Sequence, residues 1–260
     1  MATTRSSQRE QYDRDGYAVY RGVLDADLVH EAGYHVDWLQ QQHPDLRPEK
    51  LGHTLMSDDP FWVRLVSDDR LLDIAQEYVG PNIALFASHY ISKPPGDGQP
   101  VLFHQDGSYW PLEPMEVVTL WLAVDDSTAE NGCMRVVPGT QHLELQQMQR
   151  ESERPNVLGS RIDPALVDES RAVDVVLQAG DVSVHHPNVV HGSNANTSLR
   201  RRCGLTIRYI PTRTRIVSDG QWPSAFLLRG AAVPGINQYL PRPRYREGKH
   251  LRFRGCEAWA

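Results

Sequence analysis

Histidine and carboxylate side chains separated by one residue are the first sign of chemistry in this sequence. The spacing occurs over residues 35–37, 104–106 and 142–144. Such a pair, joined by a distant histidine, is typical of the facial triad that holds non-haem Fe(II) and leaves the opposite positions open. Spacing alone does not identify a site, because a chain with 11 histidines contains such pairs by chance.

The elements expected around each pair distinguish them. His35 and Asp37 lie in a predicted helix, where side chains two positions apart point about 200° apart and cannot share one ion. His104 and Asp106 follow an extended apolar segment, and side chains at i and i+2 of a strand share one face. The pair at 142–144 follows a Pro-Gly-Thr turn, so we expect it to be a surface turn. His104 and Asp106 are therefore the predicted ligand pair.

Residues 181–193 carry three histidines that are candidates for the third ligand. His185 and His186 are adjacent, so at most one of them faces inward on a strand. His191 is followed by a glycine, which lets the backbone turn away. Eleven residues further along comes Arg202, whose guanidinium can hold a carboxylate in a bidentate fork.

The composition is that of an ordinary folded protein. With 260 residues, 40% of them hydrophobic, the chain can bury a substantial core in one domain. Its net charge of −6 makes it a poor general binder of nucleic acid, and no apolar run reaches the roughly 18 residues of a membrane span. Three scattered cysteines and an N-terminal stretch without an apolar segment predict a cytoplasmic protein rather than a secreted one.

The order of the predicted elements indicates helices first and then an all-β core. Apolar spacing and capping residues predict helices over residues 25–42 and 69–79. Short segments rich in β-branched and aromatic residues then predict a β-sandwich or barrel. These strands are expected over residues 83–93, 117–124, 135–137, 173–177, 182–186 and 203–210.

The two ends of the chain are expected to be less ordered. Residues 1–12 are polar and predicted to be frayed. Residues 241–256 are rich in arginine and lysine and carry one acidic residue. We expect this segment to be a solvated tail, with a cover over an anionic substrate as the alternative.

Several segments, in this order and spacing, resemble the phytanoyl-CoA dioxygenase family of Fe(II)/2-oxoglutarate-dependent oxygenases. The similarity runs from about residue 16 to about residue 215. The segments that carry it are Gly80-Pro81-Asn82-Ile83, Lys93-Pro94-Pro95-Gly96, Phe103-His104-Gln105-Asp106, residues 121–126, residues 130–142, and His191-Gly192-Ser193 leading to Arg202. The resemblance implies a mainly β fold with flanking helices, the double-stranded β-helix or cupin-like jelly roll. It implies a single dioxygenase domain over residues 1–260, with a basic C-terminal extension over residues 216–260.

The resemblance also implies roles for individual residues. His104, Asp106 and His191 would hold Fe(II), and Arg202 and Ser193 would bind the distal carboxylate of 2-oxoglutarate. The remaining implied contacts are Trp121 and His53 with the cosubstrate, and His89, Tyr109 and Trp110 with the substrate. His142 belongs to a turn of the family that has no metal role.

The implied activity is the O₂-dependent hydroxylation, or a related oxidation, of an unactivated C–H bond, with release of succinate and CO₂. The expected substrate is a small organic molecule, either anionic or a natural-product intermediate. One alternative is a cupin-like isomerase, epimerase or hydrolase that uses another metal in the same triad. A second is a non-catalytic, ligand-binding member of the fold. Arg202 favours the oxygenase, since a hydrolase needs no clamp for a cosubstrate carboxylate.

Overall fold

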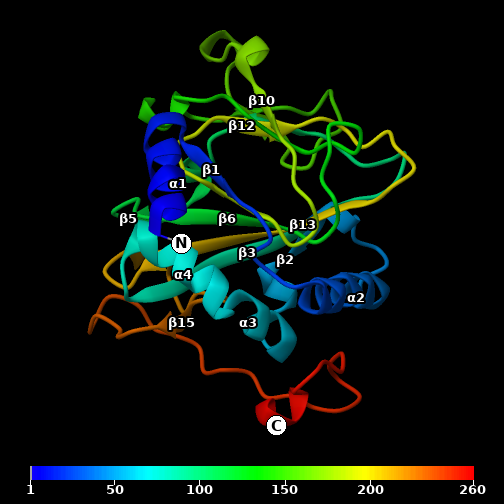
Figure 1. Cartoon of the computed structure of the whole chain (residues 1–260), viewed down its shortest axis with the longest axis vertical. Helices are drawn as coiled ribbons and strands as arrows, with labels where there is room; N and C mark the ends of the chain where they lie inside the picture. Colours follow the sequence, from blue (N-terminus) through cyan, green and yellow to red (C-terminus); the bar gives the residue numbers. More distant parts are fainter. Residues whose placement is uncertain (1) are drawn as a thin grey trace.

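Two antiparallel β-sheets face each other, and helices cover the outer face of the larger sheet (Figure 1). The structure is a computed structural model and describes residues 2–260. The larger sheet contains, in spatial order, β1 (Tyr17–Tyr20), β11 (Val182–His185), β6 (Val118–Ala123), β13 (Arg202–Pro211), β3 (Ile83–Lys93) and β15 (Phe226–Arg229), with β2 (Leu51–Gly52) paired to β3. The smaller sheet contains β10 (Val173–Val175), β7 (Met134–Val136), β12 (His191–Ser193) and β4 (Val101–His104). This pair of sheets confirms the predicted jelly roll.

Two short strand pairs and several turns of 3₁₀ helix connect these sheets. The short pairs are β14 (Arg215–Ile216) with β5 (Leu112–Glu113), and β8 (Gln149–Arg150) with β9 (Ser160–Arg161). The 3₁₀ helices span Pro48–Lys50, His53–Leu55, Asp106–Tyr109, Thr140–His142, Pro164–Leu166, Glu169–Arg171 and Cys256–Trp259. Within residues 2–260, no helix combines the length and the apolar character needed to cross a bilayer.

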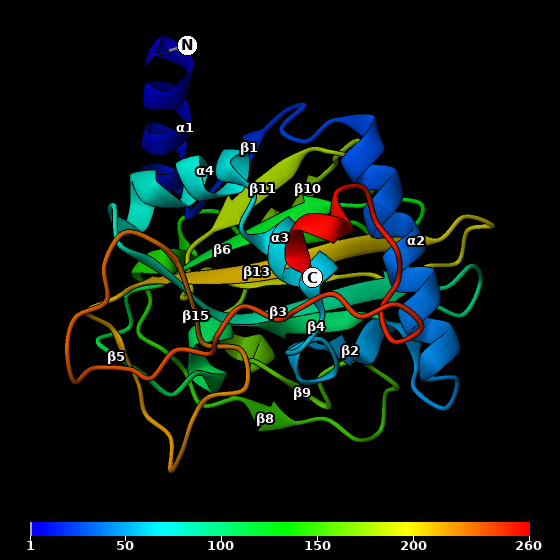
Figure 2. The ribbon, with the colours of Figure 1, turned by 90° about the horizontal axis from the view of Figure 1, so that it is seen from below.

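The helices are α1 (Ala2–Asp15), α2 (Ala26–Gln42), α3 (Pro60–Val66) and α4 (Asp69–Val79). The last three lie against the larger sheet, as the view in Figure 2 shows. The Asp25 carboxylate accepts a hydrogen bond from the Leu28 amide at 3.0 Å and caps α2, and Asp68 caps α4 in the same way. Both predicted helices are confirmed. The sequence analysis missed α3, which is only seven residues long.

Strand β13 shows why one face of the larger sheet packs and the other carries polar groups. Its apolar residues are Cys203, Leu205, Ile207 and Tyr209, and alternating with them are Arg202, Gly204, Thr206 and Arg208. The apolar set belongs to the core shared with the helices. Alternate side chains of a strand point to opposite faces, so the second set points toward the smaller sheet. A row of polar side chains therefore lies in the space between the two sheets.

The N-terminal segment differs from the prediction. The sequence predicts a frayed segment over residues 1–12, whereas α1 spans Ala2–Asp15, and Met1 lies outside the described residues. Tyr12 is buried, with its ring centroid 4.5 Å from that of Tyr78, and Arg9 Nη1 donates to the carbonyl oxygen of Glu77 at 2.8 Å. These contacts join α1 to α4, a distant segment that the composition of the N-terminus does not reveal.

Parts of the C-terminal region, residues 216–260, pack into the domain instead of forming a separate extension. Strand β15 pairs with β3 and completes one edge of the larger sheet. Most of the basic side chains of residues 241–256 are exposed, but Phe253 and Cys256 are buried on the helix side of the molecule. Figure 2 shows this segment lying over α3. That position is on the opposite side of the larger sheet from the smaller sheet and does not suit a cover over a site between the sheets.

Candidate metal centre

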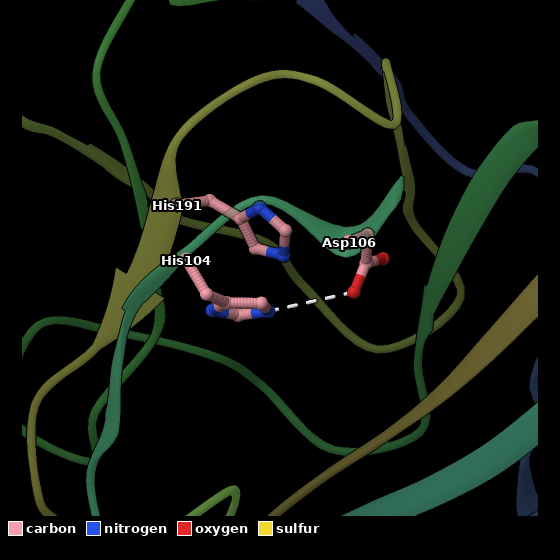
Figure 3. Close-up of side chains that lie close together, drawn as sticks. All are labelled: His104, Asp106 and His191. Carbon is pink, nitrogen blue, oxygen red and sulfur yellow. Dashed lines mark ion pairs between the residues drawn. The ribbon is translucent and has the colours of Figure 1, made fainter. Parts of the chain in front are cut away.

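Two of the three predicted metal ligands lie on neighbouring strands of the smaller sheet, and the third follows the end of one of these strands. His104 ends β4 and lies directly opposite His191, which begins β12. Gln105 continues the extended backbone, so Asp106 returns to the face of His104. Cross-strand pairing and the i, i+2 spacing thus bring the three side chains together (Figure 3). One ligand atom of each residue lies within 4.8 Å of those of the other two.

Both histidines present Nε2 to the space between the ligands. His104 Nδ1 lies 2.9 Å from the carbonyl oxygen of Leu102, and His191 Nδ1 lies 3.0 Å from that of Val189. Because a carbonyl oxygen only accepts, each Nδ1 carries the proton and donates, which leaves the Nε2 lone pair free. Metal-binding histidines are generally oriented by such a bond. The donor set and its orientation therefore fit a divalent ion such as Fe(II), held by two imidazoles and one carboxylate.

The electrostatic surroundings keep two of the ligands, Asp106 and His191, in the protonation states that a metal requires. Asp106 is buried, with Oδ1 3.4 Å from His104 Nε2 and Oδ2 3.5 Å from His185 Nε2 and 3.6 Å from Arg208 Nη2. Burial opposes ionisation, but the Arg208 charge and the neighbouring histidines outweigh it and hold the pKa of Asp106 well below its usual range. Burial beside His104 lowers the pKa of His191 well below that of free imidazole. At neutral pH Asp106 is ionised and His191 is neutral, as metal binding demands.

Arg202, Ser193 and Trp121 line the same cavity as the three candidate ligands. Arg202 donates to the carbonyl oxygen of Gly132 from Nε at 3.0 Å and from Nη2 at 2.6 Å, and its Cζ lies 5.2 Å from the Trp121 ring centroid. Lys93 Nζ donates to Ser193 Oγ at 2.7 Å. Burial and the nearby Arg202 lower the pKa of Lys93 to about 6. One end of the cavity thus offers a guanidinium and a hydroxyl to a carboxylate, and the buried Lys93 amine holds that hydroxyl in place.

The other predicted contacts lie around Arg208 or at the rim. Arg208 Nη1 lies 2.9 Å from His89 Nδ1, and its Cζ lies 5.2 Å from the Trp110 ring centroid. The ring centroids of His53 and His89 are 5.2 Å apart. Tyr109, 41% exposed, places its ring centroid 6.1 Å from that of His104, while its hydroxyl lies 2.6 Å from Ser160 Oγ. These side chains border the metal centre without belonging to the ligand cluster.

Two polar residues at this site received no role from the sequence: His185, named only as one of three candidates for the third ligand, and Arg208. His185 is the inward-facing member of its pair, with its ring centroid 4.7 Å from that of His191. His186 turns the other way, toward Tyr12. The signal for Arg208 is the alternation along β13, which places it on the same face as Arg202. For His185 the strand pattern limits the choice to one of two histidines and does not decide between them.

Gly204 provides the space in which Trp121 lies beside Arg202. A Cβ atom at position 204 would lie 2.0 Å from Trp121 Cζ2, so Gly204→Ala must displace the indole. We expect a loss of about 1–3 kcal/mol in the free energy of unfolding and weaker binding of 2-oxoglutarate, measured by denaturant titration and by calorimetry. As a control, Gly33→Ala in α2 meets no atom closer than 4.0 Å and is expected to stabilise by up to ~1 kcal/mol. Wild-type stability of Gly204→Ala would contradict the close packing of this indole.

Two partly buried histidines, His53 and His89, are expected to make the protein less stable in mild acid. Burial and the Arg208 charge lower the pKa of His53 to about 4 and that of His89 to about 3. An unfolded histidine titrates near pH 6.5, so between about pH 6.5 and 4 the unfolded chain binds protons that the folded chain does not. The free energy of unfolding therefore falls as the pH falls through this window. Denaturant titrations at pH 7 and pH 5 measure the slope, which should be shallower in His53→Gln; an unchanged slope would mean that His53 titrates normally.

A jelly roll that carries two histidines and an aspartate beside a buried arginine in one cavity defines the class of Fe(II)/2-oxoglutarate-dependent oxygenases. The family model of phytanoyl-CoA dioxygenase (PhyH) matches residues 12–204, and the chain belongs to this family. It is accordingly an Fe(II)- and 2-oxoglutarate-dependent oxidoreductase.

Curated relatives agree with this membership. The chain is 24% identical to a phytanoyl-CoA dioxygenase of Arabidopsis thaliana, over 91% of this chain and 81% of the relative. It is 28% identical to phytanoyl-CoA dioxygenase domain-containing protein 1 of Mus musculus, over 69% of this chain and 62% of the relative. The chain thus spans less than two thirds of the length of the mouse protein.

Solved structures share the fold. The apo form of ThoJ, described as a non-heme monooxygenase, has a TM-score of 0.76 and 24% identity over 90% of this chain and 87% of that chain. EctD from S. alaskensis, solved with 2-oxoglutarate and 5-hydroxyectoine, has a TM-score of 0.69 and 21% identity over 92% and 88%. The epimerase SnoN, solved with Fe3+, alpha ketoglutarate and nogalamycin RO, has a TM-score of 0.68 and 23% identity over 85% and 88%. At these identities the likeness establishes the architecture alone.

Proposed function

We propose that this enzyme hydroxylates, or otherwise oxidises, an unactivated C–H bond of a small organic molecule. In the hydroxylation, 2-oxoglutarate and O₂ become succinate and CO₂, with one oxygen atom entering succinate and the other the product hydroxyl. One observation carries the proposal: buried Arg202 lines the same cavity as His104, Asp106 and His191. A hydrolase built on the three ligands alone has no use for a guanidinium in that place.

His104, Asp106 and His191 would hold Fe(II). When bound, Fe(II) supplies the activation of O₂ and the oxidising power of the reaction. His104 and His191 would contribute Nε2, because each Nδ1 donates to a backbone carbonyl. Asp106 contributes a carboxylate whose Oδ2 is buried and has no hydrogen-bond partner among residues 2–260. Such an orphaned oxygen suits a metal ligand.

Arg202 and Ser193 would bind the distal carboxylate of 2-oxoglutarate. Ser193 Oγ already accepts from Lys93 Nζ at 2.7 Å, so its own proton is free to be donated. Arg202 is buried, and a charge pair in such surroundings is far stronger than one in water. Trp121, packed against the guanidinium, would fix its orientation and exclude water from that end. These residues act by binding and orientation.

An anaerobic titration tests the proposal. Metal-free protein is titrated with Fe(II) and then 2-oxoglutarate, and the weak visible charge-transfer band of the chelate is recorded. The band should appear, and admission of O₂ should release succinate in response to candidate substrates. Bound metal without the band would favour the isomerase or hydrolase chemistry. Failure to bind any metal would favour the ligand-binding alternative.

A further inference from the structure

A second buried cation, Arg208, lies at a different part of the cavity from Arg202. The two residues are six positions apart on β13, so their Cα atoms are about 20 Å apart along the strand. Arg202 contacts Gly132 and Ser193, whereas Arg208 lies beside Asp106, with Nη2 3.6 Å from Oδ2. Arg208 is 7% exposed and lines the same cavity as the candidate ligands. The two guanidinium groups therefore face different chemical groups.

The hydrogen bonds of Arg208 orient its guanidinium without neutralising it. Nη1 donates to His89 Nδ1 at 2.9 Å and to Thr206 Oγ1 at 2.8 Å, and both acceptors are uncharged. Nε is buried and has no hydrogen-bond partner in the part of the chain that the structure describes. Leaving a buried donor unsatisfied, or a buried charge unpaired, is unfavourable. An anionic group with oxygen acceptors would satisfy both.

The charge balance of the site with Fe(II) and 2-oxoglutarate bound also indicates a further anionic ligand. Asp106 is the carboxylate beside Arg208, but a divalent ion bound to it already exceeds its charge. The two carboxylates of 2-oxoglutarate and Asp106 supply three negative charges, against two from Fe(II) and one from each of Arg202 and Arg208. One positive charge is left uncompensated, because buried Glu49 is already paired with Arg47 at 2.9 Å. The missing charge is that of a monoanion.

An apolar wall adjoins the cation. The Trp110 ring centroid lies 5.2 Å from Arg208 Cζ and 5.9 Å from the Phe86 ring centroid. Trp222 stacks on Phe86, with centroids 5.1 Å apart and an angle of 20° between the planes. Phe86 is fully buried and supports Trp110, whose indole is only partly buried. A partly exposed indole beside one fixed cation is suited to an apolar molecule with a single charged end.

We propose that Arg208 binds a carboxylate of the substrate and that the substrate is an organic acid whose apolar part packs on Trp110. This inference rests on the proposed function, since it takes the metal and 2-oxoglutarate to be in place. A carboxylate at Arg208 has one other source, the carboxylate of 2-oxoglutarate nearest the metal. The experiment must therefore separate the two.

Benzoate and benzamide provide a matched pair of probes that differ in charge and share a ring. Protein loaded with Fe(II) is saturated with 2-oxoglutarate without O₂, which occupies the metal and Arg202, and each probe is then titrated by calorimetry. We expect benzoate to bind about tenfold or more tightly than benzamide in the wild type. The preference should fall to near one in Arg208→Gln and recover in part in Arg208→Lys. Because the ratio compares two probes on one preparation, partial misfolding of a variant does not change it.

Arg213→Gln is the matched control, because it removes the same charge from the surface. Arg213 pairs with Glu116 at 2.6 Å, and its side chain is 62% exposed. This variant should keep the wild-type preference for benzoate. Equal binding of the two probes by the wild type, or an unchanged preference in Arg208→Gln, would overturn the proposal.

The affinity for 2-oxoglutarate shows whether the carboxylate at Arg208 belongs to the cosubstrate instead of the substrate. If Arg208→Gln weakens 2-oxoglutarate binding and the wild type shows no preference for benzoate, Arg208 serves the cosubstrate and the proposal is wrong. If the wild type does not bind 2-oxoglutarate at all, the proposed function fails instead. The probe ratio can then be measured on the metal-loaded protein alone, where it still decides whether Arg208 forms an anion site.

Discussion

Replacing His191 with alanine is expected to reduce succinate formation by more than about 100-fold while leaving the fold intact. The imidazole supplies one of three donors, and two donors do not hold the ion in a fixed geometry. Loss of a residue that only supports a ligand typically costs 10–100-fold in metal affinity or activity, so loss of a ligand should exceed that range. Bound iron per chain, measured after gel filtration, should fall together with turnover, and saturating 2-oxoglutarate should not restore it.

His142→Ala provides the matched control for this experiment. His142 belongs to the 3₁₀ helix Thr140–His142, and its Nε2 lies 3.1 Å from Gln141 Nε2. It is absent from the ligand cluster found among residues 2–260, so turnover and bound iron should stay at wild-type values. Full activity in His191→Ala would remove His191 from the ligand set. Retention of iron without activity would point to His185, which lies close enough to His191 to take its place as a donor.

The elements that sequence reasoning placed well are those encoded locally. Helix α2 has its cap at Asp25 and its apolar residues at helical spacing, and strand β3 spans Ile83–Lys93, as predicted. The ligand pair follows from the same kind of local argument, since the strand geometry that brings His104 and Asp106 to one face is a property of three consecutive residues.

Local sequence patterns do not predict features that depend on pairing between distant segments of the chain. The direct opposition of His104 and His191 is set by the register between β4 and β12, and the spacing of the two residues in the chain does not encode it. Helix α1 and strand β15 are fixed by contacts with α4 and β3. The residues alone left three histidines as candidates for the third ligand, and the resemblance to a family selected His191 and gave Arg202 its role. The alternation along β13 places Arg208 on the face of Arg202, but its position beside Asp106 depends on how the two sheets pack.

Arg202→Gln is expected to raise the dissociation constant for 2-oxoglutarate by about 30-fold or more. Truncating one partner of a buried, hydrogen-bonded charge pair typically costs 2–5 kcal/mol, and each 1.4 kcal/mol is tenfold in affinity. The glutamine amide can still donate to the carbonyl oxygen of Gly132, which favours retention of the local fold. The anaerobic chelate band, recorded against 2-oxoglutarate concentration, measures the effect.

The kinetic signature should differ from that of the ligand variant. Arg202 holds the far end of the cosubstrate equally in the bound state and in the transition state, so its loss raises KM for 2-oxoglutarate and largely spares kcat. His191→Ala lacks a metal ligand and loses kcat, which no concentration of 2-oxoglutarate restores. As a control, Arg200→Gln removes a charge that is 58% exposed and 3.5 Å from Glu130, and should change neither constant. Wild-type affinity for 2-oxoglutarate in Arg202→Gln would transfer the clamp to Lys93, the buried amine that donates to Ser193 Oγ.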